Sequence, residues 1–255
     1  MARDLGLVAE NLIWEDAAKG WERYMDFRKS IGLITGIFSM RRLAQGLMVA
    51  AALMVCTFNV AYAQDDSIYG TVKVTFQPVQ SLGETWGCTF VYSAVYPDSV
   101  YLKGTPIAID GNITILQFGA KLGLQLKVGV KKLVGVGSIK PPNFAYLKSD
   151  NYSTAKAQQM IHDGDAGHRL FDYSLYESSV VGVYNEMLES GKVTIAFNRK
   201  KDGLDVLVPV NLRVVDSEVL KKKKVNRKIS EKSLQDFAEC AAKLSYQAEQ
   251  VKSAK

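Results

Sequence analysis

From residue 70 onward, the chain is dominated by short runs in which apolar and polar residues alternate. This is the pattern of β-strands with one buried face. The clearest run is KLGLQLKVGV at 121–130, where every second residue is leucine or valine. The runs YGTVKVTF at 69–76 and GCTFVYSAVY at 87–96 are rich in the β-branched and aromatic residues that strands favour. The pattern predicts a mainly β (α+β) fold.

Two longer runs predict β-hairpins, because each holds an Asp-Gly pair between alternating apolar residues. TPIAIDGNITILQFG at 105–119 is predicted to turn at Asp110-Gly111-Asn112. KVTIAFNRKKDGLDVLVPVNLRVVD at 192–216 is predicted to turn at Asp202-Gly203. Between these hairpins, residues 135–166 show no clear period and include a Pro-Pro pair. This segment is predicted to be a long loop with a short helix at 154–161.

Two segments have apolar residues at helical spacing. In ESSVVGVYNEMLESG at 177–191, Ser178 or Ser179 is predicted to cap the start and Gly191 to end the helix. SLQDFAECAAKLSYQAEQVK at 233–252 predicts a C-terminal helix that starts with a capping box of Ser233 and Asp236. Its apolar stripe is Leu234, Phe237, Ala241 and Leu244.

Together these elements predict one domain, a β-sandwich or a strongly curved antiparallel sheet with one or two packed helices, including the C-terminal helix. The core is predicted to contain Val72, Val74, Phe90, Ile115, Leu124, Leu126, Tyr184, Ile195, Phe197, Val208, Val210 and Phe237.

The segment MRRLAQGLMVAAALMVCTFNVAYAQDDS at 40–67 has the three parts of a secretory signal peptide. The pair Arg41-Arg42 is the basic part, residues 47–58 are the apolar core, and Ala61-Tyr62-Ala63 is a small-x-small cleavage motif. Cleavage between Ala63 and Gln64 would place the protein in the periplasm or outside the cell.

This signal divides the chain into three parts. Residues 1–39 are interpreted as a misassigned N-terminal extension, residues 40–63 as the signal peptide, and residues 64–255 as a single exported domain. The alternative is an uncleaved anchor with residues 1–39 as a cytoplasmic tail. The apolar core is shorter than the ~20 residues that a spanning helix needs, which favours cleavage.

The cysteine count fits export. Cys56 would leave with the signal peptide, so Cys88 and Cys240 would remain as an even pair in an oxidising compartment. They are predicted to form a disulfide, with two buried free thiols as the alternative. The absence of a CxxC motif argues against a zinc site.

The segment HDGDAGH at 162–168 holds both histidines of the chain. His162, Asp163, Asp165 and His168 are the types of side chain that bind metals, but their spacing matches no known metal motif. A solvated turn explains the composition equally well. A hydrolytic triad of Ser174, His168 and Asp172 would require choosing neighbours without geometric support, and the chain lacks a GxSxG motif. We therefore expect no enzyme activity and no cofactor.

A basic run, KKKKVNRK at 221–228, has six cationic side chains. In an exported protein it favours an anionic partner such as lipid headgroups, lipopolysaccharide or another envelope protein, with only peripheral membrane contact and no nucleic acid. The alternative is a solvated linker. The six residues are Lys221, Lys222, Lys223, Lys224, Arg227 and Lys228.

Residues 177–212, together with TWGCTF at 85–90, resemble the invasion-associated locus B family. The shared features are a helix followed by the 192–212 hairpin, and a strand that carries Trp86 and Cys88. The chain departs from the family in having fewer cysteines and an added basic linker and C-terminal helix. The resemblance implies a small exported β-sandwich protein of Gram-negative bacteria with a non-enzymatic role in the cell envelope or host contact. It supplies no site residues.

The functional expectation is therefore an exported, non-catalytic envelope protein that acts as a binding or accessory module. Two alternatives stay open: a metal-dependent binder or hydrolase centred on His162–His168, and a lipid- or glycan-binding protein. The segment NFAYLKSDNY at 143–152 is the candidate aromatic platform for a glycan.

Overall fold

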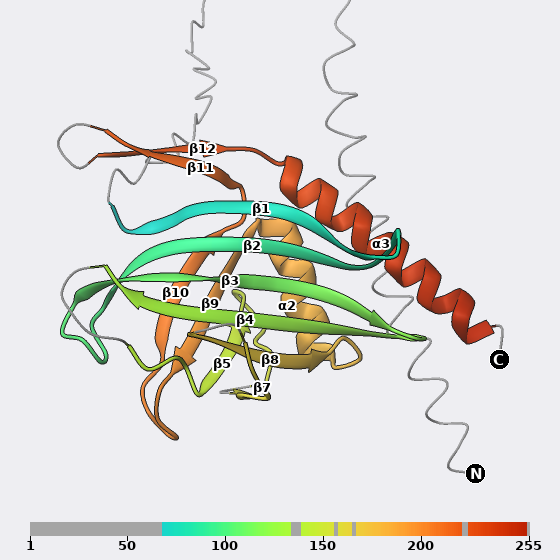
Figure 1. Ribbon diagram of the computed structural model, residues 1–255, viewed down its shortest axis with the longest axis horizontal. Helices are drawn as coiled ribbons and strands as arrows, with labels where there is room; N and C mark the ends of the chain where they lie inside the picture. The colour runs from blue at the N-terminus through green and yellow to red at the C-terminus, as the bar shows by residue number, and fades with distance from the viewer. Residues whose placement is uncertain (1–67, 134–138, 156–157, 165–166, 221–223, 254–255) are drawn as a thin grey trace, which may run out of the picture.

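The computed structural model describes residues 68–133, 139–155, 158–164, 167–220 and 224–253. The predictions for residues 1–39 and for the signal at 40–63 therefore lie outside the described residues. The described chain forms a large antiparallel sheet, a smaller antiparallel sheet, a two-stranded hairpin and two helices (Figure 1). This is the predicted β-rich α+β fold with a C-terminal helix.

The large sheet contains six strands in the order β1-β2-β3-β4-β8-β7. The smaller sheet has the order β10-β9-β5-β6, and β11 pairs only with β12. The strands of the large sheet are β1 (Gly70–Ser81), β2 (Glu84–Asp98), β3 (Thr105–Phe118), β4 (Lys121–Lys132), β7 (His162–Asp163) and β8 (His168–Ser174). The remaining strands are β5 (Phe144–Lys148), β6 (Gln158–Gln159), β9 (Lys192–Asn198), β10 (Val206–Asn211), β11 (Val214–Val219) and β12 (Val225–Ile229). The helices are α2 (Ser178–Ser190) and α3 (Lys232–Ser253).

The alternating pattern of the sequence gives the large sheet one apolar face. Its register places five apolar side chains in one row across β1, β2, β3, β4 and β8, and the row lies in the core. The row is Phe76, Phe90, Ile113, Leu126 and Phe171. Of the twelve predicted core residues, ten are buried, whereas Val72 and Tyr184 are only half-buried.

The hairpin predicted at Asp110-Gly111-Asn112 is wrong, because β3 runs through this tripeptide without a turn. Gly111 instead allows two neighbouring strands to approach closely, because it has no side chain. A Cβ atom at Gly111 would lie 1.8 Å from the backbone oxygen of Lys127, and the buried hydroxyl of Tyr92 donates a hydrogen bond to that same oxygen at 2.8 Å. Burial also raises the pKa of Tyr92 well above its usual value, so this hydroxyl keeps its proton.

The substitution Gly111→Ala is expected to lower the free energy of unfolding by about 2–3 kcal/mol, because the new methyl group would overlap backbone atoms of the neighbouring strand. Urea unfolding followed by circular dichroism measures the effect. Gly123→Ala is the matched control in β4, since its Cβ would meet its nearest atom at 3.5 Å, an ordinary contact. Equal stability of the two variants would contradict the packing role of Gly111.

The other predicted elements are mostly confirmed, with corrections at their ends. The second hairpin forms from β9 and β10, and Gly191 ends α2 in a left-handed conformation as predicted. The predicted caps at Ser178 and Ser179 are wrong, because the helix begins there and Glu177 is the N-cap. The capping box of α3 is also wrong, because the helix begins at Lys232 and Ser233 lies inside it. Asp236 instead contacts Lys232 Nζ at 2.9 Å. The predicted apolar stripe of α3 is buried.

The long loop predicted at 135–166 contains an unpredicted strand. β5 lies in the small sheet between β9 and β6, with Ala145, Tyr146 and Leu147 buried. The short helix predicted at 154–161 is wrong at Gln158–Gln159, which pairs with β5 as strand β6. A strand of five residues is too short for its period to be recognised against a helix.

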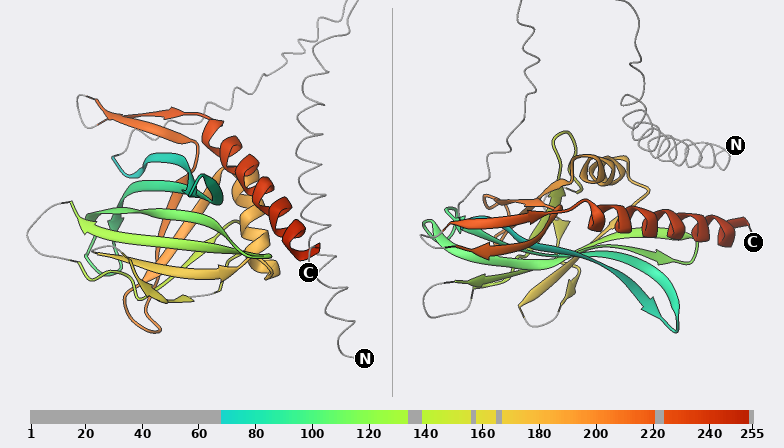
Figure 2. Two further views of the ribbon diagram at one scale, coloured as in Figure 1. Left: turned by 45° about the vertical axis from the view of Figure 1, so that its right-hand side comes forward. Right: turned by 90° about the horizontal axis from the view of Figure 1, so that it is seen from above.

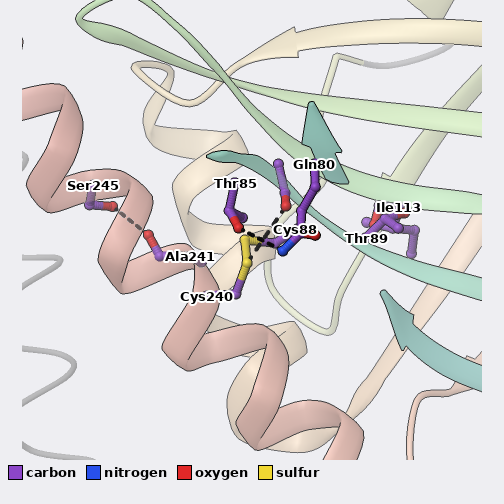
Figure 3. Close-up of a disulfide and its surroundings, with 9 residues drawn as sticks. Gln80, Thr85, Cys88, Thr89, Ile113, Cys240, Ala241 and Ser245 are labelled. Carbon is purple, nitrogen blue, oxygen red and sulfur yellow. Dashed lines mark hydrogen bonds between the residues drawn. A yellow bond between two sulfur atoms is a disulfide. The ribbon is translucent and has the colours of Figure 1, made fainter. Parts of the chain in front are cut away.

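Helix α3 packs on the apolar face of the large sheet near β1 and β2. The Phe237 ring stacks on Phe90 with centroids 4.1 Å apart and meets Phe76 edge-on at 6.3 Å. The predicted disulfide is present and joins Cys88 of β2 to Cys240 of α3 (Figure 3). Helix, disulfide and aromatic stack together hold one end of the sheet's apolar face.

Candidate binding groove

The two histidines do not share a site. His162 Nε2 lies 3.4 Å from Asp172 Oδ2, whereas His168 Nε2 lies 3.2 Å from Asp110 Oδ2. Asp163 pairs with Arg169 at 2.9 Å, and Asp165 lies outside the described residues. Within the described ranges, no three His, Cys, Asp or Glu side chains are grouped so that they could hold a metal ion.

His168 instead belongs to an ion-paired cluster on the large sheet. Its ring lies over Gly129, where a Cβ atom would be only 2.5 Å from the imidazole. Asp110 also accepts from Lys131 Nζ at 3.3 Å. Ser174 lies six residues along the same strand, or about 20 Å from His168 at the usual rise of a β-strand. The Ser174–His168–Asp172 triad considered from the sequence is therefore not assembled.

The basic run at 221–228 is divided between different environments. Lys221, Lys222 and Lys223 lie outside the described residues, while Lys224 and Lys228 are exposed. The prediction that Arg227 contacts an anionic partner is corrected, because its guanidinium is used within the folded domain. Its Nε donates to Thr71 O at 2.9 Å and its Nη2 donates to Tyr69 O at 2.6 Å. The linker prediction is also wrong for residues 225–229, which form β12 against β11.

The aromatic segment at 143–152 presents one exposed ring, that of Tyr152, and not a row of rings. Tyr146 is buried and donates a hydrogen bond to Asp205 Oδ2 at 2.8 Å. Burial and the Asp205 carboxylate raise the pKa of Tyr146 to about 12. The ring of Tyr152 packs over Gly182 of α2. Both tyrosines therefore have structural contacts.

A groove of about 1130 Å³ lies between the end of the β1–β2 hairpin and α3. The hairpin end bends away from the helix, which is visible when the molecule is seen from above (Figure 2, right). The bend coincides with a β-bulge: Val79 pairs with Gly87 and Gln80 with Thr85, so Trp86 is left without a partner on β1. A bulge bends its strand and redirects the side chain of the extra residue.

Three large apolar side chains remain uncovered at this groove, those of Leu82, Trp86 and Val251. Trp86 is 44% exposed and Leu82, at the hairpin turn, is fully exposed. Leu82 has a φ of 52° and Gly83 a φ of 85°, a pair of positive values typical of a type I′ turn. Leucine rarely adopts a positive φ, so the turn holds an exposed apolar side chain in a costly conformation.

The polar side of the groove is acidic. Three carboxylates line it, those of Glu84, Asp236 and Glu239, against one ammonium group, that of Lys243. The whole chain has a net charge of +6, so the groove reverses the sign of the protein's charge locally. Asp236 is paired with Lys232, whereas the carboxylates of Glu84 and Glu239 make no hydrogen bond or ion pair with other described residues.

Sequence reasoning missed this groove. The TWGCTF motif drew attention to Trp86 only as part of a family resemblance, and the tripeptide Ser81-Leu82-Gly83 carries no obvious signal. The sequence offered only a Leu-Gly pair at the end of a strand pattern, which does not show that Leu82 is exposed.

Comparison of the chain with protein-family models, with curated proteins and with solved structures finds no match. The resemblance to the invasion-associated locus B family therefore stays a prediction. None of the described helices has the length and apolar character needed to span a membrane.

Proposed function

We propose that this protein is an exported, non-catalytic module of the cell envelope that binds a ligand in the groove between the β1–β2 hairpin and α3. The observation that carries the proposal is that Trp86 and Leu82, two exposed apolar side chains, line this groove. Exposed large apolar side chains that gather at a concave surface mark interaction sites.

Export is part of the proposal and has independent support. The signal-like segment at 40–63 would direct the chain to the periplasm with cleavage after Ala63. The Cys88–Cys240 disulfide is compatible with this location, because disulfides persist in oxidising compartments. A peripheral contact with anionic lipid or lipopolysaccharide through Lys221–Lys224 and Lys228 stays a prediction from the sequence.

The absence of catalysis is proposed from the contents of the groove. Neither of the chain's two histidines lines it, and both contact carboxylates elsewhere on the large sheet. The groove is lined by an aromatic ring, amides, carboxylates, one ammonium group and the hydroxyls of Ser81 and Thr85. Neither hydroxyl is hydrogen-bonded to a histidine or a carboxylate among the described residues, so the lining supports ligand binding better than nucleophilic catalysis.

The groove is expected to bind at least one member of a small panel of probes: a neutral maltooligosaccharide, a cationic peptide and an anionic peptide. Saturation-transfer NMR on the full chain measures this binding. The substitution Trp86→Ala should weaken it by about 2 kcal/mol, because truncation of an anchoring aromatic residue removes its contact area. Tyr246→Ala is the control, since Tyr246 is also exposed on α3 but does not line the groove.

Two results would contradict the proposal. One is a panel in which no probe binds. The other is binding that survives Trp86→Ala unchanged, because the ligand would then occupy a different surface.

A further inference from the structure

We infer that the ligand of this groove is a cationic peptide segment with apolar side chains, supplied by another protein of the envelope. The inference rests on the proposed binding function and names its ligand class. Three features of the groove support it: the sign of its charge, the direction of α3 along it, and the exposed aromatic ring.

Charge complementarity favours a cation. The groove contains three carboxylates and one ammonium group in a chain whose net charge is +6. Glu84 comes from the hairpin, whereas Asp236 and Glu239 come from α3, so carboxylates flank the groove on both sides. Such an arrangement attracts a positively charged partner and repels an anionic one.

The helix adds to this preference. Groove residues on α3 extend from Asp236 in its second turn to Val251 in its last turn. The C-terminal end of a helix carries a partial negative charge from its unpaired carbonyl groups, which favours cations nearby. One end of the groove therefore has negative side chains, and the other has the C-terminal turn of α3, where Lys252 offsets part of the negative end of the helix dipole.

The apolar residues explain why the cation should belong to a peptide with apolar side chains. The exposed ring of Trp86 can accept a lysine or arginine over its face and an apolar side chain at its edge. Leu82 adds apolar contact area at the turn. A neutral sugar could stack on Trp86 and donate hydroxyl hydrogen bonds to Glu84 and Glu239, but it would leave their negative charges uncompensated, whereas a cationic side chain would neutralise them.

The hairpin favours a peptide that is bound through its side chains over one that adds a strand to the sheet beside β1. Pro78 lies in the part of β1 that borders the groove, and proline cannot donate a backbone hydrogen bond to a neighbouring strand. The peptide is therefore expected to lie in the groove between hairpin and helix and not to extend the sheet at β1.

The test uses the full chain with Trp14 and Trp21 replaced by phenylalanine, so that Trp86 is the only tryptophan. The probe is a blocked ten-residue peptide of alternating lysine and leucine. The comparison probes are the same peptide with glutamate in place of lysine, and maltohexaose. We expect saturable fluorescence changes of Trp86 with the lysine peptide only, and weaker binding when the salt concentration rises from 25 to 250 mM.

Charge variants sharpen the test. The double substitution Glu84→Gln/Glu239→Gln should weaken binding of the lysine peptide about tenfold, since each exposed ion pair contributes modestly. Lys243→Gln should strengthen the same binding about threefold, a gain that a folding defect could not produce. Glu249→Gln is the matched control, because Glu249 is exposed on α3 but does not line the groove.

The outcomes separate this inference from the proposed function. Binding of maltohexaose or of the glutamate peptide, without the lysine peptide, would retain the groove as a binding site and overturn its ligand class. Binding of none of the three would overturn both. The chain carries a cationic segment of its own at Lys221–Lys224, which in a second copy would be a candidate occupant of the groove. If the protein self-associates and replacing these lysines with serine abolishes the association, the groove is assigned to a second copy and the assignment to another protein is overturned.

Discussion

Replacing Cys88 and Cys240 with alanine is expected to lower the free energy of unfolding by about 4–5 kcal/mol. The disulfide joins residues 152 positions apart, so its removal frees a very long loop in the unfolded chain. Urea unfolding of the full-length double variant and of the wild-type chain, both without reductant, measures the difference. Wild-type protein in reductant should approach the stability of the variant.

We also expect the disulfide to affect ligand binding, because α3 forms one wall of the groove. Cys240 lines the groove directly, and its bond to Cys88 holds the helix against β2 (Figure 3). Reduction should therefore weaken ligand binding as well as stability. A double variant within about 1 kcal/mol of the wild type would mean that the Phe90–Phe237 stack and the surrounding core hold α3 without the covalent bond.

The strands and the disulfide could be predicted because their signals are local or countable. Period-two alternation identified the buried face of β4 residue by residue, and its leucines and valines are all buried. The pairing of Cys88 with Cys240 followed from counting the cysteines that remain after the proposed cleavage. Neither inference required knowledge of how distant segments pack.

The errors arose where a residue's contacts in the tertiary structure differ from the role that its local sequence indicates. Gly111 follows an aspartate, which is a turn signal, but it is needed because Tyr92 reaches the backbone of the next strand but one. Arg227 belongs to a basic run, but its guanidinium donates to the first residues of the described chain. The groove depends on a bulge at Trp86 and on the path of α3, which lies about 150 residues later in the sequence.

Breaking the ion pair between Asp98 and Arg199 is expected to lower the free energy of unfolding by about 3–5 kcal/mol. Asp98 ends β2 and has a fully buried side chain, while that of Arg199, which follows β9, is 10% exposed. Arg199 Nη2 lies 3.0 Å from Asp98 Oδ2, and the guanidinium lies over the ring of Tyr101. The pair therefore connects the large sheet to the small one.

The loss in free energy of unfolding comes from the buried charge that remains when one member of the pair is removed, and this makes the prediction specific. Arg199→Met would leave a buried carboxylate that is held only by the backbone amides of Val100 and Tyr101. The double variant Asp98→Asn/Arg199→Met should be less destabilised than Arg199→Met alone, which a double-mutant cycle by urea unfolding measures. Lys131→Met is the control, because its pair with Asp110 is exposed and should contribute less than about 1 kcal/mol. Equal losses for the control and Arg199→Met would show that burial does not set the strength of the pair.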